Sequence, residues 1–508
     1  MDPQRSPTRA ERDSFYNGLP SRPKLVARSS TTPLRLGLDG WSSERKTLTV
    51  VGEHAIVGKW NDEPSSLRND ILDILARQKV DWQAVDILRI GYADDKTPVI
   101  LSISVSAGTP WEVGSQVARD CREALVENGL DDVHCEIKES RLVNLASVLQ
   151  QDSHQHPPYF HSYMYHLSDQ LGTSIASREV PYREGTKGIY LRRAGGGPDQ
   201  IFALTCRHVC YLESEGCLLP KEKSLSSKSI IHLPERTTER LVKELNERRD
   251  DLIEGLRREE AKGEPYNQGD NKPRSDKIAT YQQAILETDR LLQNFILRED
   301  LDTRVFGYVA YASDYVVRTS KCLSDWCLIR LEAESHERRL SELSNRVYIG
   351  PQSLSTLFPR TVRVRDPDHD GTLHIQDVVA VSELQNTKRK LTVGMRGRTS
   401  DLRFGLVNQV KSVTRRVLID GEAFLSQECC IVADRVNCAF SERGDSGACV
   451  FDLEGRAVGM VTSGITRDEV LQGNDDYGLD RAMDVTYATP MEWLLADMKA
   501  CGLSMEIL

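Results

Sequence analysis

The chain has 508 residues, of which 39% are hydrophobic and 28% are charged, and its formal net charge is −10. This length predicts two or three domains, and the acidic balance argues against a general nucleic-acid-binding protein. No apolar run approaches the roughly 20 residues that cross a bilayer, and the polar N-terminus lacks the apolar segment of a secretory signal. We therefore expect a cytoplasmic or nuclear protein without a membrane partner.

The first part of the chain predicts a leader followed by a small α+β domain. Residues 1–44 are polar and rich in Ser, Pro, Arg and Thr, so we expect them to be disordered. Residues 45–147 alternate strand and helix patterns in the order β-α-β-β-α-β, which is typical of a ferredoxin-like sandwich. This domain carries no catalytic constellation, and a role in docking or folding fits it better.

Residues 148–170 predict a linker that contains several histidines. His154, His156, His161 and His166 invite a metal-site interpretation. No carboxylate or thiol lies at ligand spacing, and two consecutive prolines interrupt any helix, so we favour a plain connector.

Residues 171–495 predict a β-rich domain with one helical interruption. Short strands and turns alternate throughout, except over 233–300, where two charged segments each carry one apolar stripe. We expect an inserted antiparallel helical hairpin there. We favour a solvent-exposed insertion without a function of its own. The alternatives are a partner-binding arm or a flap over the cleft. Residues 496–508 are expected to form a C-terminal tail.

The cysteine pattern predicts neither a structural metal nor disulfides. The twelve cysteines are scattered and none forms a CxxC pair, and without a secretory signal most should be free thiols. Residues Asp366 to Asp377 match a calcium-loop template in part, but an Asp-Gly turn between strands is favoured. We expect no metal and no cofactor.

The strongest chemical signal is the loop Gly444-Asp445-Ser446-Gly447, which precedes a predicted β-hairpin. Flanking glycines permit a tight turn, and the amides of Gly444 and Ser446 are placed to form an oxyanion hole. A serine nucleophile needs a histidine base and an orienting carboxylate. His208 follows an apolar strand and Asp325 precedes another, in the chain order His, Asp, Ser.

The segments TCRHV, SDWCLIRL and GDSGACVF, around His208, Asp325 and Ser446, resemble the three active-site motifs of trypsin-like (chymotrypsin-fold) serine peptidases. The segment VGMRGRTS, which begins at Val393, is similar to a strand of intracellular and fungal members of that group. The resemblance covers about residues 170–495. It implies an all-β double-barrel domain, with His208 and Asp325 from the first barrel and Ser446 from the second.

The same resemblance implies a substrate pocket and shows two departures. Phe440 stands where the base of the primary pocket is expected, and the strand Thr462-Ser463-Gly464 would pair with the substrate backbone, so an apolar side chain before the cut is favoured. Secreted members are activated by a cut before an Ile-Val-Gly-Gly-like sequence, and the freed amino group pairs with the Asp next to the serine. No such sequence is present here, so Asp445 needs another partner. The cysteines also do not match the disulfides of secreted members.

These features lead to one functional interpretation and one alternative. The first is an intracellular serine endopeptidase that hydrolyses peptide bonds through a Ser-His-Asp triad and an acyl-enzyme intermediate. The alternative is a degenerate peptidase fold that acts as a binding or scaffold module. In both cases a protein or peptide is the ligand, and a protein partner would bind the N-terminal domain or the 233–300 hairpin.

Overall fold

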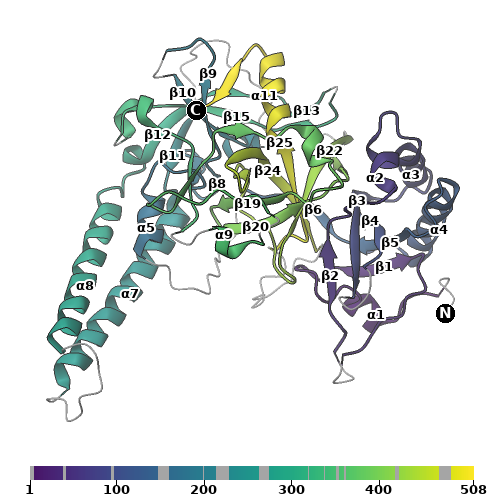
Figure 1. The fold of residues 1–508 in the computed structure, drawn as a ribbon, viewed down its shortest axis with the longest axis horizontal. Helices are drawn as coiled ribbons and strands as arrows, with labels where there is room; N and C mark the ends of the chain where they lie inside the picture. Colours follow the sequence, from purple (N-terminus) through teal and green to yellow (C-terminus); the bar gives the residue numbers. More distant parts are fainter. Residues whose placement is uncertain are drawn as a thin grey trace.

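The structure is a computed structural model. It describes residues 5–37, 42–92, 97–146, 160–197, 200–212, 228–262, 274–318, 320–336, 338–350, 354–359, 362–417, 421, 423–467 and 482–508, and the side chains of 160–162 lie outside this description. The protein is multidomain, of mixed α/β type and rich in β-sheet (Figure 1). Two large sheets form its body. Among the described residues, no helix is long and apolar enough to cross a bilayer.

The N-terminal region builds a sheet in the order β1-β5-β4-β3, with β2 also paired to β3 and with helices on it. Its elements are α1 (Arg9–Ser14), β1 (Lys24–Arg28), β2 (Lys46–Thr49), α2 (Ile56–Asn61), α3 (Ser66–Arg77), β3 (Trp82–Tyr92), β4 (Val99–Val105), α4 (Trp111–Glu127), β5 (His134–Glu139) and β6 (Arg141–Asn144). The apolar stripes of α3 and α4 bury Leu67, Ile71, Val117 and Leu125 in one core with the sheet. Ser65 caps α3 by accepting a hydrogen bond from the amide of Arg68.

The expected disorder of residues 1–44 is wrong for much of that segment. β1 pairs antiparallel with β5, and Phe15, Tyr16, Leu19 and Leu25 are buried. The hydroxyl of Tyr16 also donates to Glu136 over 2.9 Å. A polar composition hid these few large apolar residues, whose burial is enough to order short elements against an existing sheet.

The ferredoxin-like strand order is also wrong. In a ferredoxin-like sheet the first strand of the predicted series, here β2, would lie between β4 and β5. Instead β4 and β5 pair directly and in parallel, and β2 pairs with β3. The free side of β5 is taken by β1, which the sequence had assigned to the leader.

The C-terminal half contains a closed ring of six hydrogen-bonded strands. Pairings run from β19 to β20, β22, β25, β24, β23 and back to β19. The strands are β19 (Thr392–Gly397), β20 (Asp401–Val407), β22 (Ala423–Ala433), β23 (Cys449–Asp452), β24 (Arg456–Thr466) and β25 (Val485–Pro490). A further strand, β21 (Ser412–Val417), pairs with both β22 and β3, so the N-terminal sheet continues into this ring. The N-terminal region is therefore not a separate tethered domain.

The second large sheet has the order β26-β9-β10-β15-β12-β11-β7-β8. Its strands are β7 (Ser174–Ser177), β8 (Gly185–Thr186), β9 (Tyr190–Arg193), β10 (Ile201–Thr205), β11 (Ser229–His232), β12 (Val305–Ala312), β15 (Cys327–Leu331) and β26 (Met505–Ile507). The expected C-terminal tail is wrong, because α11 (Met491–Ala500) leads into β26, which pairs with β9. Met498, Leu503 and Met505 anchor this end in the apolar core.

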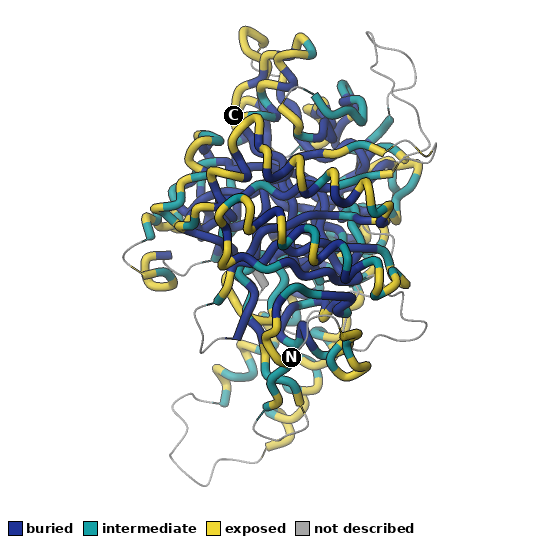
Figure 2. The backbone as a smooth tube through the Cα atoms, turned by 90° about the vertical axis from the view of Figure 1, so that its right-hand side faces the viewer, coloured by how far each residue is buried: buried dark blue, intermediate teal, exposed yellow. Residues whose placement is uncertain are grey.

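Two long helices project from the body (Figure 1). α7 (Glu235–Ala261) and α8 (Arg274–Ile296) contact each other along one seam, and the buried residues Leu241, Leu245, Leu291 and Phe295 lie where the pair joins the body. Figure 2 shows the backbone buried mainly through the centre of the body.

The remaining elements are short. They are α5 (Phe160–His166), α6 (Arg207–Cys210), η1 (Leu301–Arg304), β13 (Val316–Val317), β14 (Leu323–Ser324), η2 (Ala333–Ser335), η3 (Leu340–Glu342), β16 (Arg346–Tyr348), α9 (Leu354–Leu357), β17 (Thr372–His374), β18 (Asp377–Val378) and α10 (Val381–Leu384).

Candidate active site

The loop that carries Ser446 is held in a conformation that only glycine adopts readily. Gly444 has φ +112° and Gly447 has φ +92°. A Cβ at Gly444 would stand 2.1 Å from Thr399 Oγ1, and one at Gly447 would stand 2.2 Å from Thr205 Oγ1. Both glycines are therefore required by backbone angle and by close approach.

The structure brings His208, Asp325 and Ser446 together. His208 Nδ1 lies 2.6 Å from Asp325 Oδ2, and His208 Nε2 lies 2.6 Å from Ser446 Oγ. The backbone amide of His208 also donates to Asp325 Oδ1 over 3.1 Å. Because the carboxylate accepts from Nδ1–H, Nε2 is left to accept the proton of the serine hydroxyl.

The elements that present these side chains come from both large sheets. His208 lies in α6, directly after β10, and Asp325 lies between β14 and β15. β10 and β15 are paired neighbours, which fixes the imidazole against the carboxylate. Ser446 lies just before β23, in the closed ring, and its carbonyl oxygen accepts from the amide of Thr186 over 2.8 Å. The site is therefore built across the seam of the two sheets.

Asp325 is held ionised despite complete burial. Burial alone raises the pKa of a carboxyl group. The electrostatic attraction of His208, its two hydrogen bonds and the charge of Arg416 outweigh that effect, so the pKa of Asp325 lies below its ordinary value. A carboxylate charged in this position stabilises an imidazolium that forms during proton transfer.

Asp445 has partners of its own in the turn after β19. Its carboxylate accepts hydrogen bonds from the amides of Thr399 and Ser400, at 2.9 Å and 3.2 Å, and from the hydroxyl of Ser400 at 2.5 Å. The amide of Glu442 donates to its other oxygen over 2.8 Å. Burial raises the pKa of Asp445 while these bonds lower it, and burial dominates. These contacts hold the loop that carries Ser446 without a free amino terminus.

A buried ion pair ties the same turn to the helical hairpin. Arg398 Nε donates to Glu184 Oε2 over 2.6 Å, and both side chains are fully enclosed. Thr237, in the first turn of α7, donates to Glu184 through its amide at 3.0 Å and through its hydroxyl at 2.6 Å. The base of the hairpin is thus joined to the turn that holds Asp445.

The predicted pocket residues are all buried. Phe440 is buried beneath β20, so that a Cβ on Gly405 would stand 2.7 Å from its ring. Thr462, Ser463 and Gly464 lie in β24, and the carbonyl oxygen of Thr462 is 3.2 Å from Ser446 Oγ. The role of these residues as a substrate pocket stays a prediction.

A segment of the N-terminal region covers this site. β6 pairs antiparallel with β24, and Leu145, just beyond β6, is fully buried in one apolar cluster with Phe440. The amide of Gly444, a predicted oxyanion-hole donor, donates to the carbonyl oxygen of Leu145. Ser446 and His208 both have no exposed surface. Figure 1 shows β6 between the closed ring and β3.

Two metal interpretations fit the side chains poorly. Atoms of Cys206, His208 and Asp325 lie within 4.8 Å of one another. Burial and the charge of Asp325 raise the pKa of the Cys206 thiol well above its usual value, whereas a metal binds the thiolate. The second interpretation is the partial calcium-loop match over Asp366 to Asp377. In this segment Asp370 accepts hydrogen bonds from Thr372, and Asp368 pairs with His374 at 3.1 Å.

Of the four linker histidines, His154 and His156 fall outside the described residues and His161 has no described side chain. His166 is buried at the end of α5.

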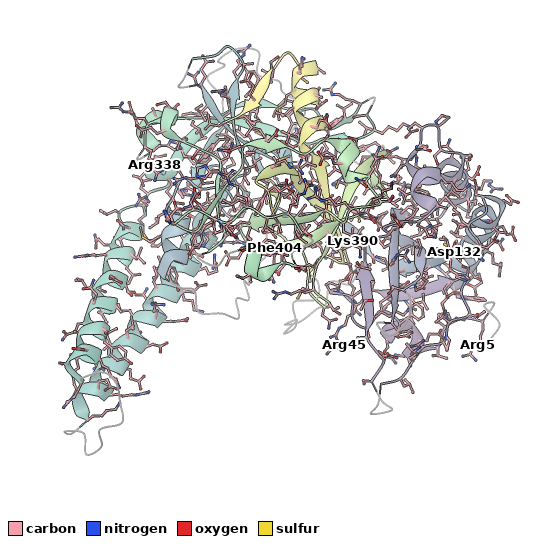
Figure 3. The ribbon with its side chains drawn as sticks, in the orientation of Figure 1. Arg5, Arg45, Asp132, Arg338, Lys390 and Phe404 are labelled. Carbon is pink, nitrogen blue, oxygen red and sulfur yellow. The ribbon has the colours of Figure 1, made fainter. Side chains whose placement is uncertain are left out.

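Figure 3 places Asp132 and Arg45 on the N-terminal region and Arg338 at the opposite side of the body.

A scan against protein-family models finds no match for this chain, and a search of curated proteins finds none either.

Sequence reasoning missed two groups that matter here. One is the pair Thr399 and Ser400, which hold Asp445 mainly through backbone amides. Because almost every residue type has a backbone amide, the sequence gives no signal for these contacts. The other is Leu145, whose only sequence signal is an apolar residue after a short strand pattern.

Proposed function

We propose that this protein is a serine endopeptidase of the trypsin-like kind, with Ser446 as nucleophile. One observation carries the proposal: His208 joins Asp325 and Ser446 through two contacts of 2.6 Å each, in the orientation that general-base catalysis needs. The closed six-stranded ring and the eight-stranded sheet, with the site at their seam, support a double-barrel interpretation.

In this mechanism each group has one task. Ser446 Oγ attacks a peptide carbonyl carbon while His208 takes its proton, and His208 later gives that proton to the leaving amine. Asp325 holds the imidazole tautomer and stabilises its charged form. The amides of Gly444 and Ser446 stabilise the oxyanion, where loss of one donor costs about 2.7–4 kcal/mol in comparable sites. Phe440 selects an apolar side chain before the cut.

A second candidate rests on the burial of the site. Ser446 has 0% exposed surface, and a serine that no ligand reaches is what a scaffold protein would tolerate. We favour the enzyme because a binding module has no need of the paired contacts at His208. A cytoplasmic or nuclear location, with protein or peptide substrates, completes the proposal.

The test is covalent labelling of the serine with a fluorophosphonate probe. Because Leu145 covers the site, the full-length Leu145→Arg variant is used, which places a cation in an apolar pocket and displaces the segment. We expect the label on Ser446, and none after the additional change Ser446→Ala. A folded Leu145→Arg protein without label would contradict the proposal.

A further inference from the structure

The segment that covers Ser446 lies as a substrate would. β6 runs antiparallel to β24, with Asn144 opposite Ser463 and Val143 opposite Gly464. Addition of an extended strand to an open edge is a common way to bind a peptide, because main-chain hydrogen bonds give affinity and side-chain pockets give specificity. The chain itself supplies that strand here.

The backbone of Leu145 completes this arrangement next to the nucleophile. Its amide donates to the carbonyl oxygen of Thr462 over 3.4 Å, and the same carbonyl oxygen lies 3.2 Å from Ser446 Oγ. Its own carbonyl oxygen accepts from the amide of Gly444. The peptide group after Leu145 is therefore polarised by a donor of the proposed oxyanion hole.

The side chains on the two sides of that peptide bond enter different cores. Leu145 is fully buried in the apolar cluster of the closed ring, together with Phe440 and Val461. Ala146 packs against the apolar cluster of the eight-stranded sheet. The two residues on either side of this bond therefore pack in different apolar clusters.

The neighbouring residue is also fixed. Asn144 Oδ1 accepts a hydrogen bond from Arg416 on β21. The same arginine contributes to the low pKa of Asp325 through its charge. The segment is held on both sides of its strand, by β24 through the backbone and by Arg416 through a side chain.

We propose that the Leu145–Ala146 bond is a substrate of this same site, so that the chain cuts itself once and keeps the N-terminal part bound as an inhibitor. The inference rests on the proposed peptidase function. Leu145 matches the apolar preference expected from Phe440, and the segment belongs to the same chain, so binding needs no encounter between molecules.

The reaction balances with water as the only co-reactant. Ser446 Oγ bonds to the carbonyl carbon of Leu145 and its proton passes to His208. The C–N bond to Ala146 breaks as His208 returns that proton to the nitrogen, which leaves an ester on the serine and a free amino group. Water then gives a proton to His208 and its oxygen to the carbonyl carbon, the ester C–O bond breaks, and the serine regains its proton. The products are a carboxylate at Leu145 and an amino terminus at Ala146.

The cut pieces would remain together because the N-terminal part shares its cores with the rest. Val410 and Val413 belong to the apolar cluster of the N-terminal sheet. Another cluster joins Tyr16 and Leu25 to Tyr487. Two polar contacts add to these: Ser21 donates to Asp484 over 2.6 Å, and Tyr487 donates to Asp86 over 2.8 Å.

The experiment compares full-length wild type with Ser446→Ala by intact mass spectrometry and terminal sequencing. Wild type should yield two chains that meet between residues 145 and 146, of about 16 and 41 kDa from 57.2 kDa in proportion to residue number. The Ser446→Ala protein should stay a single chain. The two wild-type pieces should co-elute in native size-exclusion chromatography and separate only in denaturant.

Variants at Leu145 test the pocket. Leu145→Met keeps an apolar side chain of similar volume and should be cut like wild type. Leu145→Arg should be cut at least about 100-fold more slowly, because the pocket discriminates through apolar contact, and it should react with the fluorophosphonate probe at least about tenfold faster than wild type. Should Leu145→Arg fail to fold, Leu145→Gly takes its place, with slower cutting and faster labelling than wild type.

The outcomes separate this inference from the proposed function. An intact wild-type chain beside a Leu145→Arg protein labelled at Ser446 would overturn self-cleavage and leave the peptidase in place. A folded Leu145→Arg protein without label, beside an intact wild type, would overturn both. Cutting that persists in Ser446→Ala, or that occurs at another bond, would also refute the inference. Cutting whose half-time does not change on dilution identifies the reaction as intramolecular.

Discussion

Glu428 offers a prediction whose size follows from its surroundings. It lies on β22, fully buried, where Ser426 donates to its Oε1 over 2.6 Å, and its Oε2 has no hydrogen-bond partner among the described residues. Burial raises the pKa of Glu428 from 4.5 to about 7, against the lowering effects of Ser426 and Arg416, while the charge of Asp325 adds to the rise. We therefore expect the folded protein to hold this carboxyl protonated in mildly acidic solution.

The sign follows from linkage. The folded pKa lies above the unfolded one, so the stabilisation by the bound proton is complete below pH 4.5 and is lost as the pH rises to about 7. The difference in pKa corresponds to about 3 kcal/mol in the free energy of unfolding. Glu428→Gln keeps the shape and carries no charge, so it should escape this loss. Relative to its parent, the variant should gain about 2–3 kcal/mol between pH 5 and pH 8.

The assay is urea unfolding at both pH values, in a Ser446→Ala background that keeps the chain whole. Glu123→Gln, at an exposed position of α4, is the matched control and should show no comparable pH-dependent gain. If the difference between Glu428→Gln and its parent is the same at pH 5 and pH 8, the carboxyl is ionised throughout and the reasoning is wrong.

Three further predictions concern the site and its supports. Asp325→Asn should lower the rate constant of serine acylation by about 10⁴ with little change in the melting temperature, because the imidazole loses its orienting charge; a loss below tenfold would contradict the assignment. Ser400→Ala removes a 2.5 Å bond to Asp445 and should lower the free energy of unfolding by about 1.5–3 kcal/mol, measured by urea titration. Glu184→Ala removes the carboxylate that pairs with the buried guanidinium of Arg398 and should lower the free energy of unfolding by about 3–5 kcal/mol by the same measurement, whereas an unchanged midpoint would refute the buried pair.

The triad was accessible to sequence reasoning because its signals are local. A serine between glycines before a hairpin, a histidine after an apolar strand and an aspartate before another can each be read within a few residues. Their chain order then suggested a common site. The distances that join His208 to both partners needed the structure.

The rest was hidden because it depends on pairing between distant segments. β1 and β2 look alike as short patterns, and only the parallel pairing of β4 with β5 decides where each one goes. Residues 141–144 are an unremarkable strand pattern until β24 is placed beside them. The braces on Asp445 are mostly backbone amides, which every residue except proline possesses.

The account depends above all on Ser446 forming an acyl-enzyme. The most direct measurement is a rapid-mixing experiment with an activated ester of an apolar acyl group, which separates acylation from the slower steps that follow. The full-length Leu145→Arg protein should release a burst of about one equivalent of alcohol per chain, and Leu145→Arg with Ser446→Ala should release none. A folded Leu145→Arg protein without a burst, or a burst that survives the loss of Ser446, would contradict the account.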